Sequence, residues 1–484
     1  MSLLRHLSLG LLLLSQVQAR KNQFIVPGAT WYDTSGAVLH GHAGGIVHVA
    51  SEGPPPGTFY WFGQNEEEGV KDIFSALNVY SSTDLLNWDF RGRALEPIVG
   101  TDIDPGRVAE RPKAIFSEKL GEWVLWFHSD NATYGLLRQG VATSPNITGP
   151  YTFRGAFSPL GGTSQDFGLF QDVDGQAYSL YSNGDADAAH DNLITRLNAN
   201  FTNDEEVVYT FENFDLEAPA MVFTGKRYYV LMSHKTGYRP NNVVVFSAEN
   251  IAGPWSVQSY IAPSGTRTFN SQSTMLIKVP GSRTTTYLYC GDQWSTSSDL
   301  WDSRYIWLPA DINDATGSFT VDWHDLYSID VKTGLVSFPK GTTYEAEKGQ
   351  MTGSAHSTVC PTCSGAGIVT GITGNASLTI SNIVGTGKPQ WVSFYYHNPD
   401  GLFGDNRGVS GQSFTLFRFA SVVVNGGSPV TLRQRDTNAG IILSMPLNIT
   451  FSQGSKNTLT ISGLDGGPAA DLDRIVVYGN MYDD

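Results

Sequence analysis

The chain has 484 residues, a net charge of -15 and a pI near 5.1. No Lys/Arg cluster is dense enough to follow a phosphate backbone, which argues against a nucleic-acid partner and favours a neutral or weakly charged ligand. The length allows two or three domains.

The first 19 residues have the pattern of a secretory signal peptide. A short basic region precedes the apolar run Leu11–Leu14, and the small residue Ala19 stands at the expected cleavage point. This apolar run is too short to span a bilayer, and no later stretch is long enough, so we expect a secreted protein without a membrane partner. Five Asn-x-Ser/Thr sites fit an extracellular glycoprotein: Asn131, Asn146, Asn200, Asn375 and Asn448.

Residues 20–335 predict a repeated all-β domain. Aromatic-rich strands are expected at Thr58–Phe62, Trp123–Phe127, Ala177–Tyr181, Tyr228–Met232 and Tyr287–Cys290. Their central residues (Trp61, Trp126, Tyr181, Met232 and Tyr289) stand 51 to 65 residues apart. This period suits propeller blades of about four strands, so we predict a five-bladed β-propeller.

A polar residue stands a few positions ahead of an apolar strand in each of these repeats. The five are His42, Glu110, Asp166, Glu217 and Gln272. Equivalent strand starts in a ring would bring the five side chains to one shared central site. Asp166 and Glu217 form a carboxylate pair, and paired carboxylates in a sugar-sized pocket are typical of glycoside hydrolysis.

A second all-β unit is expected after a short linker at 336–343. Residues 344–484 contain alternating strands whose spacing fits a β-sandwich of jelly-roll type: Ser377–Ile383, Gln390–Tyr396, Ser421–Asn425, Thr458–Ile461 and Arg474–Tyr478. Cys360 and Cys363 are expected to form a small local disulfide, with a redox or zinc site as the alternative. Cys290 is predicted to be a buried free thiol.

Several short motifs, in this order and spacing, resemble a known family. In the first unit they are Glu110-Arg-Pro-Lys113, Ser164-Gln-Asp166, Phe170-Gln-Asp172-Val-Asp-Gly175, Leu216-Glu217-Ala-Pro219, Ser271-Gln272 and Ser303-Arg-Tyr-Ile-Trp307. This unit resembles the five-bladed propellers of glycoside hydrolase family 43, and within it the exo-β-1,3-galactanase branch. Tyr344-Glu-Ala-Glu347 and Ala470-Asp-Leu-Asp-Arg-Ile475 make the second unit similar to carbohydrate-binding module family 35.

The resemblance implies roles for the central polar residues. Glu217 would be the general acid, and its apolar neighbours Leu216 and Pro219 would raise its pKa; the alternative is a solvent-facing strand cap. Asp166 would tune and orient that acid, with a turn aspartate as the alternative. An inverting hydrolase also needs a base, and most of the family has an aspartate on the first blade, where this chain has His42 and no carboxylate.

Two residues compete for the part played by that base. Gln272 would position the attacking water, or act as the base through its imidic-acid tautomer. Glu110 is the rival base by its charge, which the adjacent Arg111 would maintain; in the branch it contacts sugar instead. His42 would be either a sugar ligand or a packed histidine.

The remaining predicted ligands lie in both units. Tyr134, Trp294 and Arg304 would line the sugar site, or else pack within the blades. Arg418 and Asp471 match module positions that grip galactose hydroxyls. Glu345, Glu347 and Asp473 resemble a structural Ca²⁺ site; the alternative is three acidic residues on adjacent terminal strands.

Together these features predict a secreted, monomeric, inverting exo-β-1,3-galactanase that acts on arabinogalactan, needs no cofactor for catalysis and holds structural Ca²⁺. Two alternatives stay open. One is an arabinofuranosidase or xylosidase of the same fold. The other is a propeller that binds carbohydrate without cleaving it.

Overall fold

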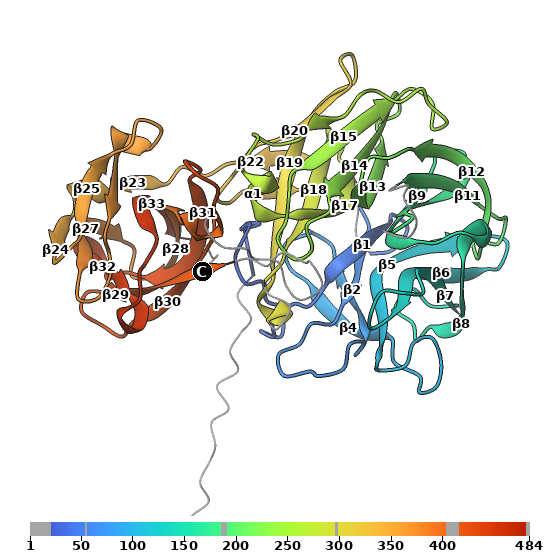
Figure 1. Cartoon of the computed structure of the whole chain (residues 1–484), viewed down its shortest axis with the longest axis horizontal. Helices are drawn as coiled ribbons and strands as arrows, with labels where there is room; N and C mark the ends of the chain where they lie inside the picture. The colour runs from blue at the N-terminus through green and yellow to red at the C-terminus, as the bar shows by residue number, and fades with distance from the viewer. Residues whose placement is uncertain (1–20, 54–55, 185–190, 296–298, 403–415, 481–484) are drawn as a thin grey trace, which may run out of the picture.

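The computed structural model describes residues 21–53, 56–184, 191–295, 299–402 and 416–480, and almost all of its regular structure is β-strand (Figure 1). The signal peptide lies outside the described residues. Within the described ranges there is one four-residue α-helix, α1 (Arg267–Asn270), and six short 3-10 turns: η1 (Pro159–Gly161), η2 (Leu300–Asp302), η3 (Ala346–Lys348), η4 (Ser364–Ala366), η5 (Pro399–Leu402) and η6 (Leu464–Gly466). No helix in this part of the chain is long and apolar enough to cross a membrane. The predicted all-β class is confirmed.

Five antiparallel sheets of four strands follow one another along the chain, each with its strands in sequence order. The first sheet is β1 (His42–Val49), β2 (Thr58–Gln64), β3 (Leu77–Ser82) and β4 (Asp89–Leu95); the second is β5 (Arg107–Ser117), β6 (Glu122–Asn131), β7 (Arg138–Ser144) and β8 (Thr152–Phe157). The third is β9 (Gln165–Gln171), β10 (Ala177–Ser182), β11 (Asn192–Leu197) and β12 (Asp204–Phe211); the fourth is β13 (Leu216–Phe223), β14 (Tyr228–His234), β15 (Val243–Ala248) and β16 (Ser259–Tyr260). The fifth is β17 (Gln272–Pro280), β18 (Thr285–Gln293), β19 (Arg304–Asn313) and β20 (Ser318–Val321).

The aromatic-rich strands predicted from the sequence are the second strand of each of these sheets, namely β2, β6, β10, β14 and β18. Their central residues are buried on both sides, and Trp61, Trp126 and Tyr289 are at most 1% exposed. A second strand lies between two hydrogen-bonded neighbours and between two sheets, which explains its run of large apolar side chains. The repeat period in the sequence is therefore the number of residues between the second strands of consecutive sheets.

The five sheets follow one another around a closed ring. First strands pack against one another in the cyclic order β1, β5, β9, β13, β17 and back to β1. Figure 1 shows these strands near the middle of the ring, with β8 and β12 farther out. The N-terminal segment completes the closure, since Ile25 exchanges backbone hydrogen bonds with Tyr327, which follows the fifth sheet. The first strand of every sheet thus contributes to one common axis.

Two further sheets make up the C-terminal part, drawn orange to red in Figure 1. One contains β23 (Thr342–Glu345), β25 (His356–Val359), β26 (Gly367–Thr370), β28 (Pro389–His397), β31 (Leu443–Thr450) and β33 (Asp471–Asn480). The other contains β24 (Gln350–Thr352), β27 (Ser377–Gly385), β29 (Phe417–Val424), β30 (Val430–Arg435) and β32 (Gly454–Gly463). A shared apolar cluster that includes Leu378, Phe394 and Ile461 packs side chains of both sheets together.

The predicted linker at 336–343 is shorter in the structure. Leu335–Ser337 forms β22, which pairs with β21 (Ser328–Asp330), and Thr342 already belongs to β23. Only residues 338–341 lie outside strands. Cys360 and Cys363 are joined by a disulfide, and Cys290 is a buried free thiol.

Close packing of first strands leaves no space for a side chain at Gly168 in β9. A Cβ atom there would lie 2.4 Å from the carbonyl oxygen of Pro219 in β13. We predict that Gly168→Ala lowers the free energy of unfolding by about 1–3 kcal/mol, because two neighbouring sheets must move apart. Denaturant unfolding measures this change. Gly106→Ala is the matched control, since its nearest neighbour would be 3.6 Å away; equal stabilities of the two variants would contradict the prediction.

Candidate active site

A β-bulge interrupts the first strand of each ring sheet beside the polar residue predicted from the sequence. Strand register breaks between His42 and Gly45, Gln165 and Phe167, Glu110 and Lys113, Glu217 and Ala220, and Ser273 and Met275. Four of these bulges contain a residue other than glycine with positive φ: Ala43 (53°), Arg111 (55°), Asp166 (41°) and Ala218 (56°). A bulge re-aims the neighbouring side chains, so the strands direct polar groups toward one end of the ring axis.

Backbone carbonyls at the bulges accept hydrogen bonds from side chains of other sheets. Ser273 Oγ donates to the carbonyl of Ala218 at 2.7 Å, and Thr274 Oγ1 donates to that of Gly44 at 3.0 Å. Lys113 Nζ donates to the carbonyl of Ala43 at 2.9 Å. Burial, with a smaller effect from Arg111, lowers the pKa of Lys113. These contacts supply partners for buried polar groups that strand pairing alone does not satisfy.

Arg111 connects three sheets beneath the site. Its Nε donates to Asp166 Oδ1 at 2.6 Å, and its Nη2 donates to Gln272 Oε1 at 2.7 Å. A longer contact of 3.4 Å joins Nη1 to the carbonyl of Ser273. Arg111 is 5% exposed. Asp166 is therefore not an isolated negative charge, because a cation is bound directly to it.

Gln272 joins this cation to Glu217. Its Oε1 accepts hydrogen bonds from Arg111 and, at 2.9 Å, from Trp294 Nε1. Its Nε2 donates to Glu217 Oε1 at 2.7 Å. Arginine and tryptophan side chains can only donate, so these contacts fix which end of the amide faces Glu217.

Glu110 lies on the second sheet between a phenol and a charged histidine. Tyr134 Oη donates to Glu110 Oε1 at 2.6 Å. His128 Nδ1 is 3.6 Å from Glu110 Oε2, and its Nε2 is 3.1 Å from Asp130 Oδ2. Burial alone would lower the pKa of His128, but Asp130 and Glu110 raise it to about 9. His128 is thus a cation at neutral pH.

These groups line a cavity of about 760 Å³, which is within the range of small-ligand sites. All five ring sheets and their loops contribute. The lining residues are Ala43, Gln64, Glu66, Glu110, Arg111, Ala132, Thr133, Tyr134, Gly135, Leu137, Gln165, Asp166, Glu217, Gly237, Tyr238, Gln272, Trp294 and Leu300. Seven of the residues predicted from the sequence to be catalytic or to bind sugar therefore line one pocket.

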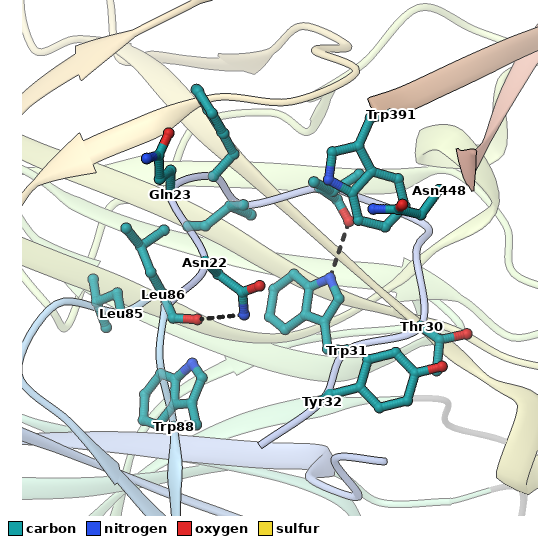
Figure 2. Close-up of a pocket in the computed structure, with 13 residues that line it drawn as sticks. Asn22, Gln23, Thr30, Trp31, Tyr32, Leu85, Leu86, Trp88, Trp391 and Asn448 are labelled. Atoms are coloured by element: carbon teal, nitrogen blue, oxygen red, sulfur yellow. Dashed lines mark hydrogen bonds between the residues drawn. The ribbon is translucent and has the colours of Figure 1, made fainter. Parts of the chain in front are cut away.

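Two other cavities lack the connected carboxylates, arginine and amide of this pocket. One, of about 850 Å³, opens at the other end of the first strands and is lined largely by their apolar side chains, from Ile46 to Leu276. The other lies between the N-terminal segment and the C-terminal sheets (Figure 2), where Trp31 and Trp391 face the same space. Among the described residues, none that lines this second cavity is acidic, basic or a histidine. The cavity of about 850 Å³ also contains Glu52, Glu118 and His48, but the cavity with Asp166 and Glu217 is the one in which two carboxylates are connected through an arginine and an amide.

Two predicted ligands are placed elsewhere. His42 is 1% exposed, stacks on Tyr305 with ring centroids 4.4 Å apart, and lies 3.1 Å from Asp292 through its Nδ1. It does not line the pocket, so the packed alternative describes its position. Arg304 is likewise outside the pocket wall and binds Asp302.

Among the acidic residues that line the pocket, Glu66 alone was not predicted. Glu66 follows the second strand of the first sheet and accepts a hydrogen bond from Gln64 Nε2 at 3.2 Å. Burial and then the nearby charges of Glu110 and Asp292 raise the pKa of Glu66 to about 8. The acidic run at 66–68 was the available sequence signal, but it lies in a loop after the strand rather than at a strand start.

The predicted module ligands also form contacts. Arg418 makes a two-pronged pair with Asp400, at 2.9 and 2.6 Å, and Asp471 lies 3.8 Å from His397 Nδ1. Residues 403–415, which follow Asp400 in the chain, lie outside the described residues.

The predicted metal ligands Glu345, Glu347 and Asp473 show unusual burial. In the described residues no group of three or more acidic, His or Cys side chains is placed to hold a metal by itself. Yet Glu345 Oε2, both carboxylate oxygens of Glu347, and Asp473 Oδ1 are buried without a hydrogen-bond partner. The closest cation to Glu347 is Lys348, at 3.6 Å. Orphaned carboxylate oxygens are costly unless a cation or proton compensates them.

Comparison with known proteins relates the chain to carbohydrate-active enzymes. Residues 56–295 match the model of glycosyl hydrolases family 43. The exo-β-1,3-galactanase from Phanerochaete chrysosporium, solved with galactose, is 38% identical with a TM-score of 0.84, and the match covers 94% of this chain and 100% of that chain. Structures of the same protein with one glutamate replaced by glutamine or alanine contain β-1,3-galactotriose.

More distant structures share part of this similarity. A family 43 β-1,3-galactosidase solved with galactodeoxynojirimycin is 29% identical, with a TM-score of 0.55, over 62% of this chain and 99% of that chain. The exo-β-1,3-galactanase from Clostridium thermocellum is 23% identical, with a TM-score of 0.60, over 88% and 100% of the two chains, which supports the fold. No curated protein sequence matches the chain.

The raised pKa of Glu66 predicts a pH-dependent stability difference. Folded Glu66 keeps a proton up to about pH 8 that the unfolded chain releases near pH 4.5, so this group makes the free energy of unfolding fall as pH rises through that window. Glu66→Gln carries a neutral amide and should gain stability relative to the unsubstituted protein between about pH 5 and pH 8. Urea unfolding at several pH values tests this, with Glu67→Gln as the exposed neighbouring control. A Glu66→Gln difference that stays constant with pH would refute the assignment.

Proposed function

The chain belongs to glycosyl hydrolase family 43 and is a glycoside hydrolase, and from this membership we propose that it is a secreted exo-β-1,3-galactanase that releases galactose from the β-1,3-galactan backbone of arabinogalactan. The observation that carries the proposal is the 38% identity over nearly the whole length to an enzyme of that activity. The cluster of Glu217, Gln272, Arg111 and Asp166 provides suitable chemistry in the pocket. We further propose that the five ring sheets are propeller blades and that the C-terminal sheets form a galactan-binding sandwich.

Glu217 is the proposed general acid. It lies at a bulge in β13, lines the pocket and is oriented by the amide of Gln272. The acid would protonate the glycosidic oxygen as the bond to the anomeric carbon breaks, while water attacks the opposite face of the sugar and passes its proton to a base. The galactotriose complexes of the relative with a substituted glutamate are what a requirement for such an acid would produce.

Asp166 acts on this acid through Arg111 in the proposed mechanism. The ion pair at 2.6 Å fixes the guanidinium, which in turn fixes Gln272. Asp166 is thus an orienting group whose own charge is balanced nearby.

Gln272 is proposed to position the attacking water and the acid as an ordinary amide. Its oxygen accepts hydrogen bonds from Arg111 and Trp294. An imidic-acid tautomer would direct an O–H group at these two donors, which disfavours that tautomer. Glu110 remains the rival base and would take the proton that the attacking water loses; it lines the pocket and accepts a hydrogen bond from Tyr134 Oη at 2.6 Å. Glu66 is a poor base, because with a pKa of about 8 it carries its proton at neutral pH.

An arabinofuranosidase or xylosidase of the same fold is less well supported. The bulge of the first sheet presents Ala43 to the pocket, where the family's usual first-blade aspartate would be expected. A carbohydrate-binding propeller without activity would not need the connected set of Arg111, Gln272 and Glu217.

Incubation with β-1,3-galactan, arabinan and xylan tests the activity. We expect galactose from the first substrate alone, formed initially with inverted anomeric configuration in proton NMR. Glu217→Gln should lower kcat by a factor of about 10³ while binding of β-1,3-galactotriose persists. Glu249→Gln, which alters a surface acid paired with Arg227, is the control. Binding without sugar release by the unsubstituted protein would refute the enzyme, and high activity of Glu217→Gln would refute the acid.

The buried carboxylates of the C-terminal sheets fit a Ca²⁺ ion. Glu345, Glu347 and Asp473 would hold it with backbone carbonyls or water, since hard oxygen ligands suit this ion. Gly365 leaves the space beside the carboxylates open, because a Cβ there would lie 2.5 Å from Glu347 Oε1. The proposed role is structural: the cation compensates oxygens that have no hydrogen-bond partner.

Removal of divalent cations with EGTA should therefore lower the Tm by about 5 °C, and added Ca²⁺ should restore it. Asp473→Asn should weaken this response, whereas Glu249→Gln should keep it. A Tm that is insensitive to both EGTA and Ca²⁺ would contradict the proposed site.

A further inference from the structure

The end of β30 in the C-terminal sheets reaches the loops of the propeller that border the active site. Arg435 is 1% exposed, and its guanidinium donates to the carbonyl oxygens of Trp294 and, at 3.3 Å, Asp302. The ring of Phe417 lies 5.1 Å from that guanidinium and supports it from within the module. A buried arginine held on two carbonyls fixes their position closely, because its donors form a rigid planar fork.

The contact with Trp294 continues into the catalytic cluster. Trp294 lines the pocket, and its Nε1 donates to Gln272 Oε1 at 2.9 Å. Gln272 then donates to Glu217 at 2.7 Å. Two residues, Trp294 and Gln272, therefore separate a side chain of the C-terminal sheets from the proposed acid.

The next residue, Asp436, binds a second loop of the pocket through hydrogen bonds. Its fully buried carboxylate accepts from Arg239 Nε at 3.0 Å and Nη2 at 2.6 Å, and from Arg267 Nη1 at 3.1 Å. Arg239 follows Tyr238, which lines the pocket and packs edge-on against Trp294 at 6.0 Å. Adjacent residues of one strand end thus hold two loops that also contact each other.

We propose that Arg435 and Asp436 are positioning residues of the hydrolase site: they hold the Trp294 and Tyr238 loops in the arrangement that aligns Gln272 with Glu217. This inference rests on the proposed function of the pocket. The C-terminal sheets are then part of the catalytic apparatus as well as a carbohydrate-binding unit. A displacement of about 1 Å in such a cluster is enough to lower turnover strongly.

The competing explanation is that Arg435 and Asp436 only stabilise the contact between the C-terminal sheets and the ring. The chain offers a matched control for this explanation. Asp325, at the end of the ring, accepts hydrogen bonds from Tyr395 Oη and Tyr478 Oη of the C-terminal sheets, each at 2.8 Å. Asp325 does not line the active-site pocket. Tyr395→Phe therefore removes a hydrogen bond between the C-terminal sheets and the ring, and leaves the contacts of the two loops unchanged.

Steady-state kinetics of full-length variants on β-1,3-galactotriose separate the two explanations. Arg435→Gln should lower kcat by about tenfold or more with KM changed by less than about threefold, because alignment in the transition state is lost. Arg435→Lys keeps a donor for the Trp294 carbonyl and should recover most of this kcat. Tyr395→Phe should keep kcat within about twofold even where its Tm falls. Unchanged kcat in Arg435→Gln, or an equal loss in Tyr395→Phe, overturns the proposal.

Hydrogen exchange provides a readout that does not depend on turnover. The amides of Ser295 and Tyr238 should exchange faster in Arg435→Gln than in the unsubstituted protein or in Tyr395→Phe. Unchanged exchange overturns the inference even if the chain proves to have another activity. If Arg435→Gln does not fold, Arg239→Gln replaces it, since Asp436 keeps Arg267 as a partner; faster exchange of Tyr238 in that variant supports the proposal, and unchanged exchange refutes it.

Discussion

The buried guanidinium of Arg111 is the interaction on which the arrangement of the pocket depends. It lies on the second sheet and binds Asp166 of the third sheet and Gln272 of the fifth. Such a charge is tolerable in the interior only because a carboxylate and two carbonyl-type oxygens surround it. In turn it defines the distances between the polar groups that those sheets bring to the axis.

The carboxylates of the pocket have different electrostatic settings, and only one of them is shown bound to the Arg111 cation. Asp166 is paired with it, Glu217 receives the amide of Gln272, and Glu110 faces Tyr134 and the charged His128. Glu66 stays protonated because burial and its acidic neighbours oppose its ionisation. Chemically identical groups in distinct surroundings are the usual way in which one site carries both acid and base functions.

Local sequence signals were sufficient for the second strands and for most of the pocket, but not for long-range partners. The aromatic strands repeat because each occupies the same doubly buried position, and polar strand starts meet because the ring brings them together. His42 has the same local signal, yet Asp292 of the fifth sheet holds it outside the pocket wall. Positive φ at Ala43 and Ala218 and the grip of Arg435 on Trp294 depend on tertiary contacts, which no local pattern encodes.

The bulges at the strand starts have an evolutionary consequence. At four of the bulges the polar side chain lines the pocket, while the remainder of the strand keeps its pairing register with the second strand. One position can therefore change its chemistry without disturbing the apolar packing between sheets. Propellers of this design can therefore change the chemistry of the pocket through few substitutions, and the first sheet has an uncharged residue, Ala43, at its bulge while the ring stays closed.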